Sequence, residues 1–370
     1  MIKNTLYLLI FFTLTMSCNN PQKKASEEEN KSAGAEDLRY PEEKQYFKSL
    51  KQLTFGGDNA EAYWSFDDEQ LVFQATNFGV ECDQIFVTNV AHANMKDQAP
   101  PMVSTGHGRT TCAYFLPGDT TILYASTHER GGEACPPEPK EREDGKYVWP
   151  IYPSFDIYVA DLEGNIQRKL TDREGYDAEA TVSPNGDKIV FTSLRSGDLE
   201  LYTMNIDGSE VKQITDKLGY DGGAFFSPDG SKLVWRASRP QTESERKEYK
   251  DLLKQGLVTP TNMELYVSDA DGSNQGKITD LGKANWSPFF HPSGEKIIFS
   301  SNHHSNRGFK FNLFMINIDG TGLKQITHDE VFDAFPVFSN GGDKIVFSSN
   351  RNNGGNYDTN LFLAEWSDKE

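Results

Sequence analysis

The chain has 370 residues, of which 25% are charged and 12% are aromatic, and its formal net charge is -18. This length suffices for one large domain or two ordinary ones. Acidic residues number 55 against 37 basic ones, whereas a nucleic-acid surface needs clustered Lys and Arg, so we expect no nucleic-acid partner. The acidic balance is typical of a soluble extracytoplasmic protein or of one that meets cationic partners.

The N-terminus predicts a secretory signal. Residues 1–17 contain one Lys and an apolar run from Leu6 to Leu14, which is too short to span a bilayer permanently. Cys18 follows directly, and the arrangement resembles the lipobox of bacterial lipoproteins, in which the Cys is lipidated and becomes the first residue. Asn19 resembles the sorting position of outer-membrane lipoproteins. We therefore expect a lipid-anchored protein of the cell envelope, at the outer membrane, facing the periplasm or the cell exterior. An ordinary cleaved signal is the alternative.

The segment after the signal predicts a tether. Residues 18–43 are polar and show no hydrophobic periodicity. Such a segment cannot bury enough apolar surface to fold. We assign 18–43 as a disordered tether and 44–370 as the folded domain.

A nine-residue unit that ends in an aromatic residue recurs six times without internal gaps. Each copy places a turn, such as Pro-Asn-Gly in "SPNGDKIVF", between two apolar runs, which predicts a β-hairpin. The copies are Ser65–Phe73, Leu116–Tyr124, Ser183–Phe191, Ser227–Trp235, His291–Phe299 and Ser339–Phe347. Repeats with such a period set the architecture of the whole chain.

Two further runs follow each hairpin. The third alternates, as in "ELYTMNI", and a second turn, usually Asp-Gly, leads to a fourth run such as "VKQIT". Four short antiparallel strands (a to d) repeated six times predict propeller blades, because a lone four-stranded sheet cannot bury both faces. The sixth copy lacks a fourth run, and Ser49–Phe55 "SLKQLTF" matches one. We predict an all-β, six-bladed β-propeller whose N-terminal strand closes the last blade; a β-sandwich or two small sheets is the alternative.

The repeat also resembles a known family. "SPDGSKLVW", the Asp-Gly turns and the "KQIT" strands are similar to the TolB-type propeller repeat, also called WD40-like or PD40, over residues from about 45 to 366. The resemblance implies a TolB-like propeller. It leaves the function open, because such propellers serve as binding scaffolds, protease gates and occasionally enzymes.

One end of the predicted propeller carries the variable loops. Since strands alternate in direction, the a–b and c–d turns share one end of each blade, and the b–c and d–a loops share the other. Two b–c loops are long, Thr127–Phe155 in blade two and Arg239–Asn262 in blade four. Thr242 and Glu245 form a capping-box pattern, which predicts a short helix in the second loop. The two insertions either cover the rim or form a partial lid over this face.

Two aligned positions at the start of strand a are expected at the mouth of the central channel. The first position reads Asn59, Thr110, Asp177, Asp221, Asn285 and Asp333. The second, two residues on, reads Glu61, Cys112, Glu179, Gly223, Ser287 and Phe335. Polar residues at the b–c ends complete the set. The candidate ligand-binding residues are Glu61, Asp177, Glu179, Asp221, Asp333, His128, Arg195, Arg239, His303, His304 and Arg351.

An acidic mouth of this kind would concentrate cations and raise some carboxyl pKa values. Its oxygen ligands suit Ca²⁺ or another divalent metal, or a peptide that bears Lys or Arg. Alternatively, the aspartates cap their own turns. No other cofactor and no catalytic residue is indicated by the sequence.

Three cysteines lie in neighbouring blades at the same predicted face. A disulfide between Cys112 and Cys135 would staple the long insertion of blade two, and we take it as the leading pairing. Pairings of Cys82 with Cys135 or with Cys112 are the alternatives. No ligand spacing supports a metal site built from these thiols and His128.

The sequence contains no motif of nucleophilic, metalloprotease or nucleotide chemistry. It favours a non-catalytic, monomeric envelope lipoprotein that binds a protein, peptide or glycan on the b–c/d–a face and meets the membrane only through its lipid. The alternative is a metal-assisted lyase or hydrolase of a small extracytoplasmic substrate. That alternative is motivated by the histidines and carboxylates, and by the lyases of acidic sugars among similar propellers.

Overall fold

Each nine-residue unit folds as a tight hairpin. The computed structural model describes residues 37–96, 98–139, 145–306 and 308–367. In the third unit the backbone N–H of Ser183 donates to the carbonyl of Lys188 (2.9 Å), and Gly186 donates to the carbonyl of Ser183 (2.8 Å). Gly186 has φ +70°, a backbone conformation that the turn requires and that glycine adopts without steric cost.

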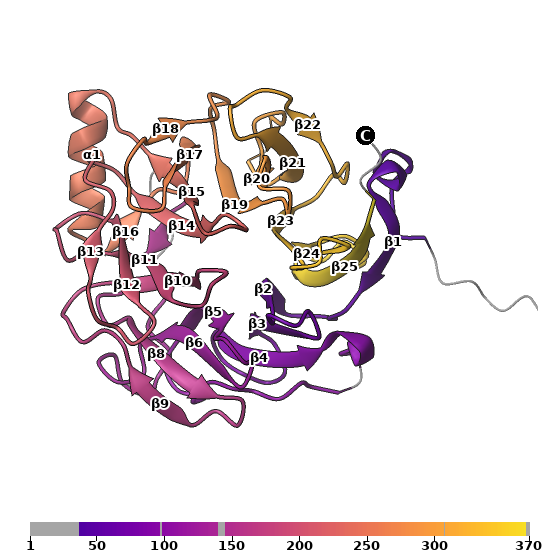
Figure 1. Cartoon of the computed structure of the whole chain (residues 1–370), viewed down its shortest axis with the longest axis horizontal. Helices are drawn as coiled ribbons and strands as arrows, with labels where there is room; N and C mark the ends of the chain where they lie inside the picture. Colours follow the sequence, from indigo (N-terminus) through magenta and orange to yellow (C-terminus); the bar gives the residue numbers. More distant parts are fainter. Residues whose placement is uncertain (1–36, 97, 140–144, 307, 368–370) are drawn as a thin grey trace, which may run out of the picture. The chain divides into compact units, whose positions relative to one another are not determined.

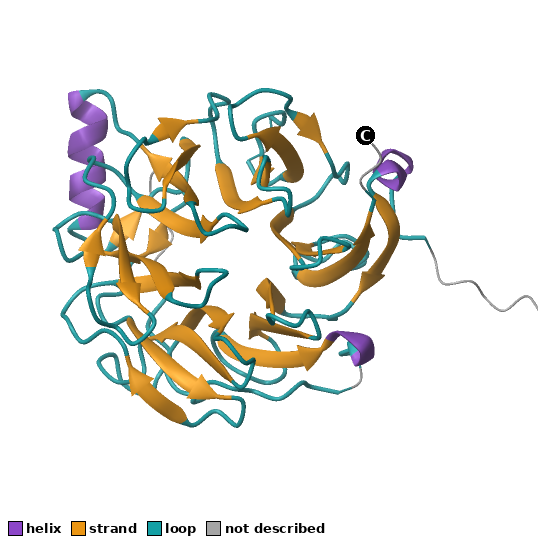
Figure 2. Cartoon of the chain, viewed as in Figure 1, coloured by secondary structure: helices purple, strands orange, loops and turns teal. Residues whose placement is uncertain are grey.

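Six small antiparallel sheets form a ring around a common centre, and loops and strands make up nearly all of it (Figures 1 and 2). The innermost strands are β2 (Asp58–Trp64), β5 (Thr110–Phe115), β10 (Asp177–Val182), β14 (Asp221–Phe226), β19 (Asn285–Phe290) and β23 (Asp333–Phe338). The second strands are β3 (Gln70–Thr76), β6 (Thr121–Ser126), β11 (Lys188–Ser193), β15 (Lys232–Ser238), β20 (Lys296–Ser301) and β24 (Lys344–Ser349). The predicted six-bladed propeller is confirmed.

The outer strands complete the blades. The third strands are β4 (Gln84–Asn89), β8 (Asp156–Asp161), β12 (Glu200–Asn205), β17 (Met263–Asp269), β21 (Asn312–Asn317) and β25 (Asn360–Trp366). The fourth strands are β9 (Ile166–Lys169), β13 (Lys212–Gln213), β18 (Gly276–Lys277), β22 (Lys324–Gln325) and β1 (Phe47–Gln52). Blade one has three strands and, in place of a fourth, a bridge between Phe86 and Met102. A short 3₁₀ helix, η2 (Val90–His92), follows its third strand.

The core lies between the blades, because the second strand of each blade is buried on both faces. In β11, for example, Ile189, Val190 and Phe191 are all fully buried. Successive side chains of a strand point to opposite faces, so both faces of this blade are covered by neighbours. The continuous apolar runs of the repeat therefore reflect packing of blade against blade.

The N-terminal strand closes the ring. β1 pairs antiparallel with β25, with Leu50 opposite Ala364 and Gln52 opposite Phe362. Figure 1 shows the earliest and latest parts of the propeller side by side in this last blade. The predicted closure is confirmed, although the strand is Phe47–Gln52 rather than Ser49–Phe55.

The compact unit begins at Leu38, six residues before the predicted boundary at Lys44. Residues Pro41–Gln45 form a 3₁₀ helix, η1, and the side chain of Glu43 is fully buried against Arg351 (3.0 Å). This ion pair holds the end of the predicted tether on blade six. The signal at 1–17, the lipidation at Cys18 and the tether up to residue 36 lie outside the described residues. Among the described residues, no helix is long and apolar enough to cross a membrane.

The two long insertions join each other over the b–c/d–a face. The blade-four insertion contains helix α1 (Glu243–Leu253), whose predicted capping box at Thr242 is present, and strand β16 (Leu257–Val258). β16 pairs antiparallel with β7 (Trp149–Pro150) of the blade-two insertion. The insertions of blades two and four therefore stabilise each other.

Candidate functional site

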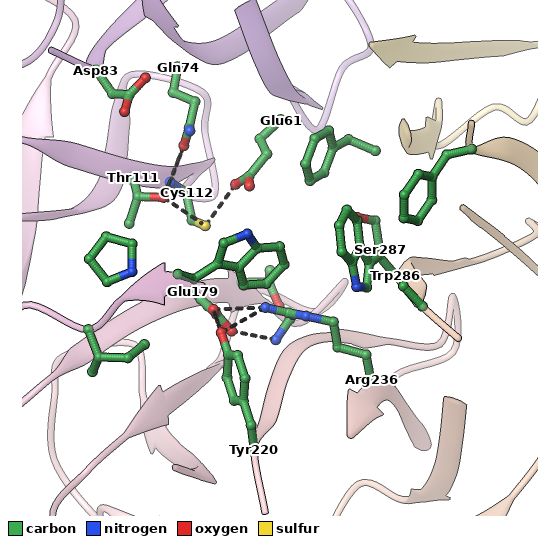
Figure 3. Close-up of a pocket in the computed structure, with 18 of the residues that line it drawn as sticks. Glu61, Gln74, Asp83, Thr111, Cys112, Glu179, Tyr220, Arg236, Trp286 and Ser287 are labelled. Carbon is green, nitrogen blue, oxygen red and sulfur yellow. Dashed lines mark hydrogen bonds and ion pairs between the residues drawn. The ribbon is translucent and has the colours of Figure 1, made fainter. Parts of the chain in front are cut away.

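A cavity of about 570 Å³ opens at the b–c/d–a end of the ring, enclosed by the first strands of the blades and by the blade-two insertion. Its size is that of sites that hold drug-sized ligands. Figure 3 shows one region where Glu61 and Cys112 point toward each other, and a second region formed by Glu179, Tyr220 and Arg236. Thirteen of the 33 lining residues are aromatic.

Each of the six innermost strands carries one bulge at the same place. The residue at this place has positive φ in every blade, and the strand register shifts beside it. We call these six residues the bulge ring: Glu61, Cys112, Glu179, Gly223, Ser287 and Phe335. All six line the cavity. Five of them are not glycine, and strain of this kind is retained in folded proteins mainly at functional sites.

An aromatic belt forms one side of the cavity. The ring centroids of Trp149 and Trp286 are 5.0 Å apart, and those of Trp286 and Phe311 are 4.3 Å apart in a stacked arrangement. Phe332 lies 5.4 Å from Phe311 and 6.4 Å from Phe335. The belt runs from the blade-two insertion across blade five to blade six, and it offers a ligand a large apolar surface.

The cavity rim exposes aromatic side chains. Tyr147 and Phe309 meet edge to face with centroids 6.1 Å apart, and their side chains are 50% and 75% exposed. Among the described residues, these two and Tyr357 (89%) are the most exposed large apolar side chains, and all three lie in b–c connections. Exposed aromatics gathered at one end of a rigid scaffold mark a contact surface.

A buried ion pair forms part of the floor. Arg236 Nη2 lies 3.0 Å from Glu179 Oε1, and the hydroxyl of Tyr220 and the N–H of Gly223 (2.6 Å) also donate to this carboxylate. Burial alone would raise the pKa of Glu179, but Arg236 and these donors hold it below its usual value. A Cβ at Gly223 would lie 2.0 Å from Arg236 Nη1, so only glycine leaves room for the guanidinium.

Glu61 is the bulge-ring carboxylate without a cationic partner. Its Oε2 accepts from the thiol of Cys112 (2.8 Å) and weakly from the hydroxyl of Tyr63 (3.4 Å). Among the described residues, no hydrogen bond reaches Oε1 and no ion pair involves Glu61. Burial, with a smaller contribution from the Glu179 charge, raises the pKa of Glu61 to about 7.

The first aligned position of strand a forms a different set, which we call the clamp ring: Asn59, Thr110, Asp177, Asp221, Asn285 and Asp333. All six are at most 2% exposed. In three blades the carboxylate binds an Arg 18 residues later: Asp177 with Arg195 (3.0 Å), Asp221 with Arg239 (2.6 Å) and Asp333 with Arg351 (3.0 Å). Of this ring, Thr110 alone lines the cavity. These three Asp–Arg pairs fasten strand a to the loop after strand b.

The predicted histidines also lie outside the cavity lining. His128 Nδ1 bonds Ser126 (2.9 Å), and its ring rests on Tyr158. His303 Nδ1 bonds Ser301 (2.9 Å), and His304 Nε2 bonds Asn312 (2.9 Å). Burial lowers the pKa of all three. Of the eleven candidate residues, the structure thus places Glu61 and Glu179 in the cavity and the other nine outside its lining.

The leading disulfide expectation is wrong. Cys135 of the blade-two insertion pairs with Cys82 of blade one, with Cα atoms 6.0 Å apart, and Cys112 is a buried free thiol. The bulge accounts for this: Cys112 has φ +45°, and its thiol donates to Glu61 in the cavity. The bridge still fastens the insertion at this face.

Sequence reasoning did not single out the aromatic walls. One usable signal was the stretch "YVWPIYPSF" of the blade-two insertion, which has four aromatic residues in nine and supplies Tyr147, Trp149, Tyr152 and Phe155 to the cavity. A second was Trp286, which lies between the two aligned positions of blade five. Within the described residues, no group of three or more His, Cys, Asp or Glu is arranged to hold a metal ion.

Fold and site together define a six-bladed β-propeller with a ligand-sized cavity at one end. The family described as the TolB beta propeller domain (PD40) matches residues 153–261. Residues 153–261 are thus similar to the TolB-type repeat, as the sequence predicts, and the described domain as a whole is a six-bladed propeller. No curated protein matches the sequence.

Solved structures share the fold at low identity. The structure of putative TolB from Agrobacterium tumefaciens has a TM-score of 0.54 and 16% identity, covering 86% of this chain and 97% of that one. TolB from Acinetobacter baumannii has a TM-score of 0.50 and 17% identity, covering 85% of this chain and 64% of that one. An oligogalacturonate lyase in complex with manganese has a TM-score of 0.50 and 12% identity, covering 86% and 93%. These likenesses concern the fold, not the activity.

Proposed function

We propose that this protein is a non-catalytic binding module of the cell envelope, which docks a protein partner on the b–c/d–a face and takes part of that partner into the cavity. The observation that carries the proposal is the coincidence of an aromatic cavity with the most exposed aromatic side chains at one end of a rigid ring. Interface hot spots are typically aromatic anchors that fill such pockets. The TolB-like fold supports a scaffold of this kind.

Site-specific photocrosslinking in intact cells tests this proposal. A photoreactive phenylalanine analogue replaces Phe309 at the rim, and as a matched control it replaces Val211, which is 43% exposed beside a c–d turn at the other end. We expect one defined protein to be captured from position 309 and not from position 211. Capture from both positions, or from neither, contradicts the proposal.

The captured protein must then bind through the cavity rim. The purified pair is titrated, and the double variant Tyr147→Ala/Phe309→Ala is compared with the unchanged protein. Removal of two aromatic anchors should weaken binding at least about tenfold, which is about 1.4 kcal/mol. Unchanged affinity would place the contact elsewhere.

The envelope location rests on the sequence pattern before and at Cys18. We propose lipidation of Cys18 and anchoring by that lipid, with the propeller reaching its partner at the end of the tether. A Cys18→Ala variant should move from the detergent phase to the aqueous phase on detergent partitioning. Retention in the detergent phase would contradict the anchor.

A metal-assisted lyase or hydrolase remains the alternative, since a lyase shares the fold. The histidines that motivated it are held by Ser126, Ser301 and Asn312 outside the cavity lining. A thermal shift with added Mn²⁺ that disappears in a His303→Ala/His304→Ala variant would favour the alternative.

A further inference from the structure

The cavity carries one carboxylate in excess of its cations. Its lining contains three carboxylates, Glu61, Asp83 and Glu179, and two guanidinium groups, Arg109 and Arg236. Arg109 is paired with Asp83 (2.8 Å), and Arg236 is paired with Glu179 (3.0 Å). Glu61 is half-buried and, within the described residues, has no such partner. Its negative charge is therefore the one in the lining that a bound cation could neutralise.

Nearby carboxylates make the surroundings of Glu61 more negative still. Glu179 and Asp83 both disfavour ionisation of Glu61, and Arg236, already paired, offsets them only in part. Tyr63 and Cys112 contact the carboxylate as hydrogen-bond donors without charge. A cation that enters the cavity would therefore meet a net negative potential, which the overall charge of -18 extends outward.

Aromatic surfaces surround the path to Glu61. Tyr63 packs against Phe225 (5.8 Å between centroids), and the belt through Trp149 and Trp286 lies across the same cavity. Aromatic faces attract ammonium groups and also cover the methylene stem of a lysine. An acidic or purely polar ligand gains neither contact.

The existing hydrogen bonds of Glu61 determine whether an ammonium or a guanidinium group fits better. Cys112 and Tyr63 occupy Oε2, and the other oxygen, Oε1, is open. A guanidinium forks onto two carboxylate oxygens, whereas an ammonium is a compact point donor that needs one. The arrangement favours an ammonium group.

Building on the proposed function, we infer that the partner inserts a lysine side chain flanked by apolar residues, and that its ammonium group binds Glu61 inside the aromatic cavity. A glycan partner is less well matched, because Gln74 Oε1 and the carboxylate of Glu179 are already engaged by other groups of the protein. Gln74 Oε1 accepts from both Thr111 and Cys112. Glu179 accepts from five donors: Tyr176, Thr192, Tyr220, Gly223 and Arg236.

Calorimetric titration of the full chain with blocked tripeptides, leucine–X–leucine, tests the inference. X is lysine, norleucine (the same stem without charge) or arginine. At pH 8 the lysine peptide should bind at least about tenfold more tightly than the norleucine peptide. This preference should vanish in Glu61→Gln and persist in Glu69→Gln, which makes the same charge change at the a–b turn of the same blade. A thermal unfolding transition verifies that both variants are folded.

Three results overturn the inference: equal affinity for lysine and norleucine peptides, a lysine preference that survives in Glu61→Gln, or tighter binding of the arginine peptide. Absence of binding by any of the peptides overturns it as well. None of these touches the proposed function, which is judged by the crosslinking at position 309. Equal binding of lysine and norleucine peptides together with successful crosslinking would leave a protein-binding cavity that does not recognise charge.

Discussion

The clamp ring and the bulge ring lie two residues apart in the same six strands, yet they do different things. Clamp-ring residues are buried, and their carboxylates are paired with Arg195, Arg239 and Arg351. Bulge-ring residues adopt positive φ and line the cavity. Both rings contain carboxylates, so acidity alone does not identify a site. The two rings differ in whether each carboxylate is already paired with an arginine, and in whether a bulge directs the side chain into the cavity.

The largest effect is expected where a clamp is broken. Asp221→Ala removes a fully buried carboxylate. It leaves the indole N–H of Trp235 without its acceptor and Arg239 without its carboxylate partner. Breaking a buried ion pair from one side typically costs about 3 to 5 kcal/mol, so the free energy of unfolding in urea should fall by that amount. A loss below about 1 kcal/mol would show that the clamp ring is not structural.

A bulge-ring carboxylate should behave in the opposite way. The pKa of Glu61 in the folded protein, about 7, lies above the ordinary 4.5, so its ionisation costs stability as the pH rises through this range. Glu61→Gln avoids that cost. Its stability relative to the unchanged protein should therefore grow by about 2 kcal/mol between pH 5 and pH 8.

Chemical unfolding at the two pH values measures this difference, with Glu69→Gln as the control. Equal pH dependence of Glu61→Gln and the unchanged protein would mean that Glu61 is well solvated. If Glu61→Gln is more stable than the unchanged protein at pH 8 and also loses the preference for lysine, Glu61 is a residue that lowers stability but serves binding.

Gly223 tests how tightly the bulge ring is built. Gly223→Ala places a methyl group at φ +59° and against Arg236, whereas Gly282→Ala places one at φ +68° with nothing within 4 Å. Both substitutions carry backbone strain, and only the first carries a clash. We expect Gly223→Ala to lower the free energy of unfolding by about 1 to 2 kcal/mol more than the control. Equal losses would mean that Arg236 moves aside freely.

The smallest effect on stability is expected at the rim. Tyr147→Ala/Phe309→Ala removes exposed rings and should change the free energy of unfolding by less than about 0.5 kcal/mol, while partner binding falls about tenfold. A large loss of stability would indicate that the rim is part of the core rather than a contact surface.

The sequence predicts most of the fold because its pattern is local and repeated. Six hairpin units, the strand that closes the ring and the helix begun by Thr242 all follow from turn residues, apolar runs and a capping box. The N-terminal boundary does not, because burial of Glu43 depends on Arg351, far away in the chain. The polar composition of residues 18–43 therefore predicts a tether up to residue 43.

The site is less predictable for one physical reason. In a regular strand, residues i and i+2 face the same side, so Asp221 and Gly223, for example, are expected together at the channel mouth. A bulge between Gly222 and Phe225 breaks this parity, and the same occurs in every blade. It also directs Cys112 toward Glu61 and thereby leaves Cys82 to pair with Cys135. Bulges have no reliable signature in a single sequence, and contacts between distant insertions have none.

Because β1 pairs with β25, the ring can close only when the first and the last strand of the propeller are both present. The hydroxyl of Thr54, just past β1, donates to the side chain of Asn360, the first residue of β25, and the two residues are 306 positions apart. At about 5–20 residues per second, the first strand waits roughly 15 to 60 seconds for its neighbour to be made. Until then the last blade cannot form and the ring has two open edges. The propeller is therefore completed only after β25 has been synthesised. Because closure depends on a contact between residues far apart in the chain, we expect closure of the ring to be slow.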